Sequence, residues 1–475
     1  MTSYDLIVAG QDVKSHTQEK IFDKYSGEAF AQVAIAEKNH IEKAIASAEE
    51  AKKTMANLPA YRRSRIIADA AKIISKKSEQ FTDIIIREAG KPYKFARAEV
   101  ERCIENIEYA AEEAKRIHGE TLPVDAGSAG VGRVGYYDRF PVGIVLAISP
   151  FNFPLNLAAH KVAPAIAAGC PVILKPSTLA PLSGIELVKA FKEAGVPDGG
   201  IHALVGPGSR VGEMLIKDNR IAKISFTGSR AVGEHITGTA GLKKITMELG
   251  SNSGAVIDNT IKNMDFAVKR CVMGAFYYQG QVCISVQRIF VHQDIYDEFL
   301  EKFISRTKEW KIGSPLDKET DLGPMISLPE AERVENWINE AAEAGANILL
   351  GGKREGSIYY PTVMTNTRPE MKVMKNELFG PGVTIQKIAS FEEGIEQCDN
   401  SEYGLQAGIF TSDITKAMKA VKSLNVGGVI INDIPTFRVD HMPYGGNKGS
   451  GLGREGAKFA IEEMTTPRMV VINLL

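Results

Sequence analysis

Apolar residues recur along the chain with two different periods, and the period changes from one segment to the next. Residues 1–35 show short alternating runs separated by turn residues, which predicts a series of strands. After residue 38, apolar side chains such as Ile41, Ala44 and Ile45 follow the helical spacing of three and four, which predicts a helix with one buried face. The same pattern predicts further helices over residues 61–75, 78–89 and 92–117. On the last of these helices we expect a solvated face formed by Glu99, Glu101, Glu105 and Glu108.

Strands and helices alternate regularly from Gly143 to about residue 250. Strands are predicted over 144–148, 171–175, 201–205 and 222–226, and helices over 156–168, 182–194, 211–216 and 229–240. Apolar strands that alternate with helices are typical of a parallel sheet covered on both faces, with ligands at the carboxyl ends of the strands. A second α/β block is predicted from residue 251 to about 429, with strands over 254–257, 288–291 and 429–432. The sequence therefore predicts an α/β protein of two or three domains.

Two segments interrupt this order. Residues 120–140 alternate glycines with valines and tyrosines, which predicts an extended hairpin. The tail, residues 467–475, is apolar and rich in β-branched residues, and alone it would form an aggregation-prone edge. We therefore expect the tail to pair with another strand, either in its own chain or in a second subunit.

Composition and charge exclude several classes of protein. The 475 residues are 44% hydrophobic and carry a formal net charge of −1, which argues against nucleic acid or an anionic membrane as the main partner. The most apolar stretch, residues 162–174, is interrupted by Pro164, Gly169 and Pro171 and is too short to span a bilayer. Five cysteines without a CxxC pair, and a first segment without the features of a signal peptide, predict a reducing, cytoplasmic location. The eight histidines form no HxxxH or HExxH pair, so no metal site is predicted.

The chemistry is predicted at Cys283, within the segment QGQVCIS. A nucleophilic cysteine needs an exposed loop and a local means of holding its thiolate, and a glycine-containing loop before a strand allows both. A single cysteine taken alone is more often a small buried apolar group. Two upstream segments change this balance, because MELGSN at 247–252 contains Glu248 and SPFNFP at 149–154 contains Asn152. Cysteine, glutamate and asparagine are the nucleophile, base and oxyanion donor that thioester chemistry on an aldehyde requires.

These three segments, together with KPS at 175–177, FTGS at 226–229 and ELFGP at 377–381, resemble the NAD(P)-dependent aldehyde dehydrogenase superfamily. The resemblance covers essentially the whole chain, with the motifs in the family's order. It implies an aldehyde dehydrogenase-like fold with a Rossmann-like cofactor-binding domain, a catalytic domain and a small β oligomerisation arm. In this sequence the cofactor-binding domain would comprise residues 1–119 and 141–250, with a return over 431–453. The catalytic domain would comprise residues 251–430. The oligomerisation arm would comprise residues 120–140 and 454–475. The arm implies a homodimer or homotetramer in which the hairpin pairs across subunits with the C-terminal strand.

The resemblance also implies a dinucleotide site. FTGS follows a predicted strand and opens a predicted helix, so its free amides face an anion, and the family's pyrophosphate contact falls on Ser229. Lys175 corresponds to the lysine on the adenosine ribose, Glu377 to the carboxylate on the nicotinamide ribose, and Phe379 to the aromatic beside the nicotinamide, with core packing as its alternative. The other expected contacts are Ser177, Thr178, Phe226, Thr227, Gly228, Gly233 and Leu249. The segment GPGSRVG at 206–212 lacks the spacing of a dinucleotide fingerprint and is interpreted as a glycine-rich turn.

The residue three positions after Lys175 bears on the choice of cofactor. NAD-specific members of the family commonly carry glutamate there, whereas this chain has Thr178. A carboxylate would repel the 2′-phosphate of NADP, and a threonine hydroxyl beside a lysine can donate to it. Arg210, in the next loop between a strand and a helix, is a further candidate cation. We therefore expect NADP to be preferred over NAD, with use of both as the alternative.

The implied reaction is the oxidation of an aldehyde through a thioester on Cys283. The thiolate attacks the carbonyl carbon, Asn152 and the backbone N–H of Cys283 hold the oxyanion, and a hydride leaves to the nicotinamide. Glu248 then activates the water that hydrolyses the thioester. Family members that pass the acyl group to coenzyme A generally lack this glutamate, so the resemblance implies a hydrolytic enzyme that releases a free acid.

The substrate is predicted as a class of small aldehyde. The segment FRVDHMPYGG at 437–446 resembles the lactaldehyde and phosphonoacetaldehyde dehydrogenase branch, in which the positions of Arg102 and Arg438 can face a substrate anion. Val282 stands where relatives that act on phosphorylated or phosphonate aldehydes often carry arginine, and Phe153, another expected substrate contact, is apolar. We therefore expect a hydroxy- or carboxy-aldehyde such as lactaldehyde or succinic semialdehyde. The alternatives are a phosphorylated or phosphonate aldehyde, and a catalytically silent scaffold of the same fold.

Overall fold

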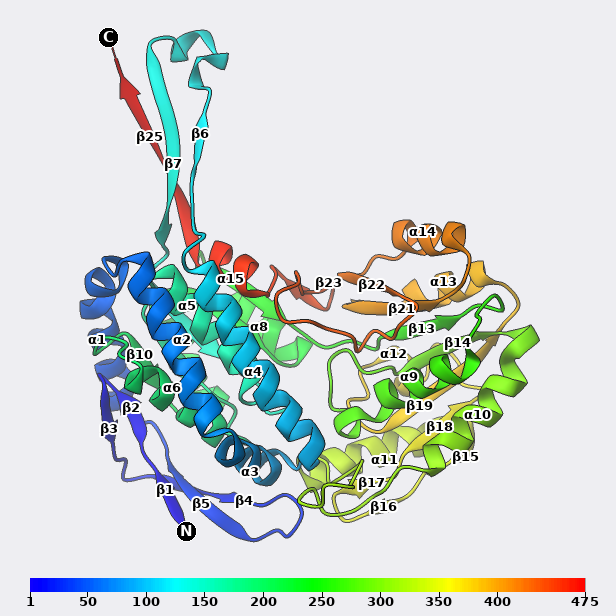
Figure 1. Cartoon of the computed structure of the whole chain (residues 1–475). Coiled ribbons are helices and arrows are strands. Elements are labelled where there is room, and N and C mark those ends of the chain that lie inside the picture. The colour runs from blue at the N-terminus through cyan, green and yellow to red at the C-terminus, as the bar shows by residue number, and fades with distance from the viewer. Residues whose placement is uncertain (475) are drawn as a thin grey trace.

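The computed structural model describes residues 1–474 and has two α/β bodies side by side, with a β arm that projects from the first (Figure 1). The first body is built on an eight-stranded sheet and the second on a seven-stranded sheet. This arrangement confirms the predicted α/β fold with two parallel sheets. No helix among the described residues combines the length and the apolar composition needed to cross a membrane.

The first sheet has a parallel centre and antiparallel edges. Its central strands β12, β11, β8, β9 and β10 pair in parallel, whereas β24 and β2 add antiparallel pairs at the two sides. Every residue of β8 and β9 is buried, which requires cover on both faces of the sheet. Across the sheet the strands are β24 (Gly451–Leu452), β12 (Lys244–Glu248), β11 (Ile221–Thr227), β8 (Ile144–Ile148), β9 (Val172–Lys175), β10 (Ile201–Ala203), β2 (Leu6–Val8) and β3 (Gln11–Val13). The domain boundaries drawn from the sequence stay a prediction, and β24 lies in the segment expected to return to this body.

The helices predicted from apolar spacing are present, with ends that differ by a few residues. The helix predicted at 92–117 ends four residues early, at Glu113, and the helix predicted at 211–216 is preceded by a π-helical turn over Gly208–Gly212. The helices of the first body are α1 (Lys38–Ala56), α2 (Ala60–Lys76), α3 (Ser78–Ala89), α4 (Tyr93–Glu113), α5 (Asn156–Ala168), α6 (Leu182–Glu193), α7 (Glu213–Lys217), α8 (Arg230–Thr239) and α15 (Ala457–Glu463). Among them α4 packs against α2, α3 and α5 and so connects the outer helices to the helix that covers β8 and β9.

Glu99 is an exception to the solvated face expected on α4. Its side chain is completely buried and forms an ion pair with Lys91, which is also completely buried. Its second oxygen accepts hydrogen bonds from the backbone N–H groups of Leu155 and Asn156, at 3.0 and 3.2 Å. These N–H groups begin α5 and have no partner within their own helix. The expectation for Glu99 was wrong because periodicity along one helix does not show which neighbouring helix end needs an acceptor.

The second sheet is parallel except for its edge strand β15, which pairs antiparallel with β18. Across the sheet the strands are β15 (Asn347–Leu350), β18 (Thr362–Thr365), β19 (Gly382–Ile388), β14 (Arg288–His292), β13 (Gly254–Ile257), β21 (Gln406–Phe410) and β22 (Gly428–Ile431). Its helices are α9 (Met264–Phe276), α10 (Tyr296–Lys308), α11 (Leu328–Glu343), α12 (Lys372–Lys375), α13 (Phe391–Asp399) and α14 (Ile414–Ser423). Small sheets are formed by β1 (Thr2–Tyr4), β5 (Ala29–Ala34) and β4 (Gln18–Phe22), by β16 (Arg354–Glu355) and β17 (Ile358–Tyr359), and by β20 (Tyr403–Gly404) and β23 (Asn447–Lys448).

The projecting arm consists of β6 (Glu120–Leu122), β7 (Arg133–Pro141) and β25 (Thr465–Asn473). The predicted hairpin is present. The C-terminal strand pairs with β7 of its own chain, from Thr465 opposite Pro141 to Asn473 opposite Arg133. The tail therefore pairs within the chain, in place of the pairing across subunits that the family resemblance implied. As an edge strand, β25 leaves its outer side open and exposes Val471 and Ile472 to solvent.

Replacing Glu99 with alanine is expected to lower the free energy of unfolding by about 3–5 kcal/mol, because Lys91 is left buried without a partner. Glu101→Ala is the matched control on the same helix, since the ion pair of Glu101 with Arg97 is exposed and contributes little. Denaturant-induced unfolding of both variants measures the difference. Equal stability of the two variants would show that the buried pair does not secure α4 to α5.

Candidate active site

The pairing register of the first sheet brings several predicted residues to one edge. Ile148 pairs with both Lys175 and Phe226, and Thr227 pairs with Glu248. Lys175, Thr227 and Glu248 are each the last residue of a strand. Because these strands run in parallel, their carboxyl ends form a single row, which is where parallel sheets bind ligands.

The second body contributes residues from loops that precede its strands. Cys283 lies before β14, and Glu377 and Phe379 lie before β19. The chain crosses from the end of β12 to the start of β13 over residues 249–253. This short crossing brings the amino ends of the second sheet opposite the carboxyl ends of the first, so Glu248 and Cys283 line a common cavity.

Two cavities meet at Cys283, which lines both. The larger has a volume of about 910 Å³ and the smaller a volume of about 320 Å³. Predicted residues in the larger cavity are Asn152, Lys175, Ser177, Thr178, Phe226, Thr227, Gly228, Ser229, Glu248, Leu249, Glu377 and Phe379. Those in the smaller cavity are Arg102, Phe153 and Arg438. Gly233 lines neither cavity. A Cβ at this position would lie 2.5 Å from the side chain of Leu249, so the glycine leaves room for the Leu249 side chain that lines the larger cavity.

The loop before Cys283 is held in a strained conformation. Tyr278 and Gln279 are in the left-handed region, with φ of 46° and 55°, which side chains other than glycine rarely adopt. The Tyr278 hydroxyl donates to the carbonyl of Ala89 at 2.8 Å, and the Gln279 amide donates to the carbonyl of Gly90 at 2.9 Å. The end of α3 in the first body therefore fixes the loop that presents Cys283.

The three candidate catalytic side chains have different surroundings. Burial raises the pKa of the Cys283 thiol to about 11, and a hydrogen bond with the Tyr444 hydroxyl opposes this shift. The Asn152 amide donates one hydrogen bond to the carbonyl of Gln281 at 3.0 Å, and an amide has a second N–H to offer. Glu248 is buried, and neither of its carboxylate oxygens has a hydrogen-bond partner in residues 1–474. Burial, with the nearby Glu455 carboxylate, raises the pKa of Glu248 well above its usual value.

A buried group of charges lies behind this site. Lys161 donates to Thr227 at 2.7 Å and to Glu455 at 2.6 Å. Glu455 also pairs with Arg438 at 3.3 Å. Lys161, together with Arg438, holds the pKa of Glu455 below its usual value. The group connects the end of β11 with the wall of the smaller cavity.

The distal part of the larger cavity contains a cation without a carboxylate partner. Lys175 is buried, and its ammonium group donates to the carbonyl of Pro176 at 3.3 Å. Burial lowers the pKa of Lys175 to about 8, and no charged group of the described chain offsets this shift. Thr178 and Ser177 line the same region. A buried cation beside two hydroxyl groups suits a phosphate or a ribose hydroxyl.

The near part of this cavity has a carboxylate and an aromatic ring. Glu377 accepts a hydrogen bond from the backbone N–H of Ser251 at 3.0 Å, and burial raises its pKa to about 7. Phe379 has a φ of 48° and packs edge-on against Phe151, with ring centroids 5.9 Å apart. This left-handed conformation at a non-glycine residue turns the Phe379 ring toward the cavity rather than into the core.

Several lining residues were not identified from the sequence. The segment after β10, interpreted as a simple turn, lines the larger cavity through Gly208, Ser209 and Gly212, whereas the exposed Arg210 does not. Its place at the carboxyl end of a strand was the signal that could have identified it. The helix α11 adds Glu330, Arg333 and Trp337. No motif marked α11, because it reaches the cavity only through the packing of the second body.

In the smaller cavity every arginine has a carboxylate partner. Arg102 pairs with Asp440 at 2.7 Å, and Arg438 pairs with Glu455. The sequence did not identify Arg270, which lines the same cavity. Arg270 makes two hydrogen bonds to Asp433, at 2.6 and 3.1 Å. The walls also include Tyr277, Thr436 and Tyr444. Such a cavity offers hydrogen-bond donors with little uncompensated positive charge.

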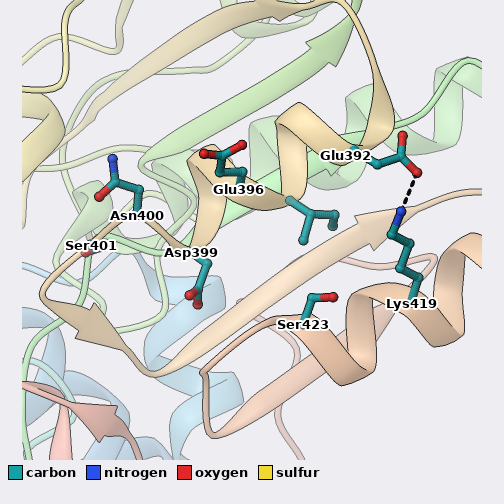
Figure 2. A pocket seen from close by; sticks show the side chains of 8 residues that line it. Glu392, Glu396, Asp399, Asn400, Ser401, Lys419 and Ser423 are labelled. Atoms are coloured by element: carbon teal, nitrogen blue, oxygen red, sulfur yellow. Dashed lines mark hydrogen bonds and ion pairs between the residues drawn. The ribbon is translucent and has the colours of Figure 1, made fainter.

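A separate cavity of about 670 Å³ lies between α13 and α14 and contains none of the predicted site residues (Figure 2). Three of its eight lining residues are carboxylates, and Lys419 is already paired with Glu392 at 2.9 Å. Nothing in its lining matches the chemistry of the cavities at Cys283.

Comparison with known proteins agrees with this geometry. Residues 11–470 match the aldehyde dehydrogenase family. A 3-sulfolactaldehyde dehydrogenase of Priestia megaterium is 44% identical over 471 residues, which cover 99% of this chain and 98% of that protein. The structure of aldehyde dehydrogenase 21 from Physcomitrella patens, in complex with the reaction product succinate, is 39% identical with a TM-score of 0.98 and covers 100% of this chain and 99% of that one. Glyceraldehyde-3-phosphate dehydrogenase GapN from Methanocaldococcus jannaschii, complexed with NADP, is 41% identical with a TM-score of 0.92 and covers 96% of this chain and 100% of that one.

The motifs, the meeting of two cavities at one cysteine and the match along nearly the whole chain lead to one conclusion. The chain belongs to the aldehyde dehydrogenase family.

Proposed function

We propose that Cys283, Asn152 and Glu248 perform the reaction of this NAD(P)-dependent aldehyde dehydrogenase, the oxidation of a small aldehyde to its carboxylic acid. The observation that supports these roles is the position of Cys283 where a dinucleotide-sized cavity meets a smaller one. An aldehyde in the smaller cavity would have its carbonyl carbon at the sulfur and its hydrogen directed toward the larger cavity. Asn152 and Glu248 line the larger cavity beside the same sulfur.

The Cys283 thiolate adds to the aldehyde carbon, and the oxyanion accepts hydrogen bonds from the Asn152 amide and the backbone N–H of Cys283. A donor of this kind typically contributes about 10²–10³ in rate. When bound, NAD(P) supplies the nicotinamide that accepts the hydride, and a thioester remains on Cys283. Glu248 takes a proton from water, and the resulting hydroxide hydrolyses the thioester to the acid and the free cysteine. Its raised pKa makes it a stronger base, and its unpartnered oxygens are free to accept from water.

The larger cavity fits a dinucleotide. Its volume suits NAD(P), and the start of α8 at Ser229 provides backbone N–H groups for a pyrophosphate. Lys175 and Thr178 would contact the adenosine ribose or its 2′-phosphate, and Glu377 would hold the nicotinamide ribose. Among residues 1–474 no carboxylate balances the charge of Lys175, which favours NADP over NAD. The NADP complex of the GapN relative supports this preference.

The smaller cavity fits a small aldehyde with a hydroxyl or one acidic group. Arg102, Arg270 and Arg438 are each paired with a carboxylate, so a dianion would meet little free positive charge. A hydroxy- or carboxy-aldehyde, such as lactaldehyde or succinic semialdehyde, needs less free positive charge than a dianion does. The 3-sulfolactaldehyde enzyme and the succinate complex among the relatives fit this class. A phosphorylated aldehyde is the second candidate, since three arginines line the cavity and the GapN relative is a glyceraldehyde-3-phosphate dehydrogenase.

Assembly and location follow from the arm and the cysteines. The open outer edge of β25 exposes apolar side chains, which a homodimer or homotetramer would cover. The five cysteines, Cys103, Cys170, Cys271, Cys283 and Cys398, are all free thiols, which supports a reducing, cytoplasmic location.

Cys283→Ala is expected to abolish oxidation of lactaldehyde and succinic semialdehyde while cofactor affinity stays within about twofold of the parent. Glu248→Gln should give one burst of reduced cofactor and then stop at the thioester, because no base activates water. Stopped-flow absorbance of the reduced nicotinamide distinguishes the burst from steady turnover. Steady turnover of the Glu248 variant at the parent rate would show that Glu248 is not the base that activates water.

Thr178→Glu is expected to move cofactor preference toward NAD, by raising the KM for NADP about 10- to 100-fold. The added carboxylate repels the 2′-phosphate and competes for Lys175. Leu179→Glu is the matched control, because it adds the same charge at an exposed position that does not line the cavity. KM values for both cofactors provide the measurement. A parent enzyme that prefers NAD, with no change in the Thr178 variant, would show that this position does not recognise the 2′ group.

Val471→Lys is expected to dissociate the oligomer into smaller species without unfolding the chain, because Val471 is exposed on β25 in the single subunit. Leu242→Lys places the same charge at a fully exposed leucine away from the arm and should leave assembly unchanged. Sedimentation velocity measures both variants and the parent. A monomeric parent protein would contradict the proposed role of the arm.

A further inference from the structure

The Tyr444 hydroxyl contacts the sulfur of the candidate nucleophile. Its oxygen lies 3.1 Å from Sγ of Cys283, within hydrogen-bonding distance for sulfur. The two residues come from distant parts of the chain and meet in the smaller cavity, which both line. No motif in the sequence marked Tyr444 as a contact of Cys283.

Tyr444 is fixed in place from two sides. Its backbone forms a bridge with Glu455, with hydrogen bonds of 3.1 and 2.7 Å in the two directions. The guanidinium group of Arg438 lies 3.6 Å from the centre of the Tyr444 ring. Arg438 is itself held by Glu455, so one carboxylate residue positions both the ring and the cation that covers it. The hydroxyl is therefore presented to Cys283 with little freedom to turn away.

The chemistry of the pair sets the direction of the hydrogen bond in the reactive state. A thiolate has no proton and can only accept. Burial raises the pKa of Tyr444 well above its usual value, so the phenol keeps its proton at neutral pH and donates. Of the charged groups around the Cys283 sulfur, Arg438 stabilises a thiolate, whereas Glu377 and Glu248 oppose it. Tyr444 thus adds a donor where two carboxylates disfavour a negative charge.

We propose that Tyr444 is a catalytic residue that stabilises the Cys283 thiolate by donating a hydrogen bond to its sulfur. This inference rests on the proposed role of Cys283 as the nucleophile. A hydrogen bond to a charged acceptor changes the proportion of thiolate about 10- to 100-fold. Loss of the donor should lower the rate of any reaction that begins from the thiolate, whichever aldehyde is used.

The test is the pH dependence of alkylation of Cys283 by iodoacetamide in the full-length protein. In this reaction the sulfur–carbon bond forms, iodide leaves, and the buffer takes the thiol proton. Cys283 is partly exposed, whereas the other four cysteines are buried, and peptide mass spectrometry identifies the labelled residue. Tyr444→Phe keeps the ring but removes the donor. It should raise the midpoint of the pH profile by about one to two pH units and slow labelling at neutral pH about 10- to 100-fold.

Tyr109→Phe is the matched control. Tyr109 packs against His441 near the same loop and loses an equivalent hydroxyl without contacting Cys283. Its labelling profile should match that of the parent. If Tyr444→Phe also kept the parent profile, the proposal would be overturned. Tyr444→Leu, which lacks both the donor and the ring, provides a second variant and should show the same upward shift.

Steady-state kinetics separates this role from recognition of the substrate. Tyr444→Phe should lower kcat/KM by a similar factor for lactaldehyde and for propionaldehyde, because both react with the same thiolate. A loss confined to lactaldehyde would mean that Tyr444 binds the 2-hydroxyl group, which would overturn the proposal. Cys283→Ala provides the independent check on the underlying function. Retained activity in the Cys283→Ala variant would show that Cys283 is not the nucleophile, whatever the labelling of Tyr444→Phe showed.

Discussion

The active site depends on the short crossing between the two sheets. Residues 249–253 connect the last residue of β12 to the first of β13, so the carboxyl ends of one sheet face loops at the amino ends of the other. The first sheet can then bind a dinucleotide along its strand ends, while the second presents Cys283 toward it.

Buried charges hold the surrounding elements in place. Lys91 and Glu99 connect α4 to the beginning of α5, which follows Asn152 in the chain. Lys161 and Glu455 connect the end of β11 to the wall of the smaller cavity. Such pairs cost desolvation energy and are weak contributors to net stability, but each becomes costly to break once it is buried. They therefore oppose small shifts of the elements around the two cavities.

The two cavities differ in how their charges are balanced. In the larger, Lys175 is buried with no carboxylate partner among residues 1–474, and a bound anion would supply one. In the smaller, Arg102, Arg270 and Arg438 are each paired with a carboxylate. The larger cavity therefore favours an anionic ligand, whereas the smaller one offers chiefly hydrogen-bond donors. This difference supports the proposed binding of a highly charged dinucleotide beside a small aldehyde.

The sequence by itself predicted the helices and the strands and marked Cys283 as the candidate site of the chemistry, because apolar spacing and short motifs are local properties that need no partner elsewhere in the chain. Only the tertiary structure decided that Glu99 is buried, that the tail pairs with its own β7, and that Tyr444 reaches the sulfur. Each of these depends on a contact between residues far apart in the sequence. Neither segment alone fixes such a contact: the apolar composition of the tail predicts a pairing but not the strand that it pairs with, and the spacing along α4 does not show which glutamate is buried. Packing decides these contacts, because most buried polar groups need a partner.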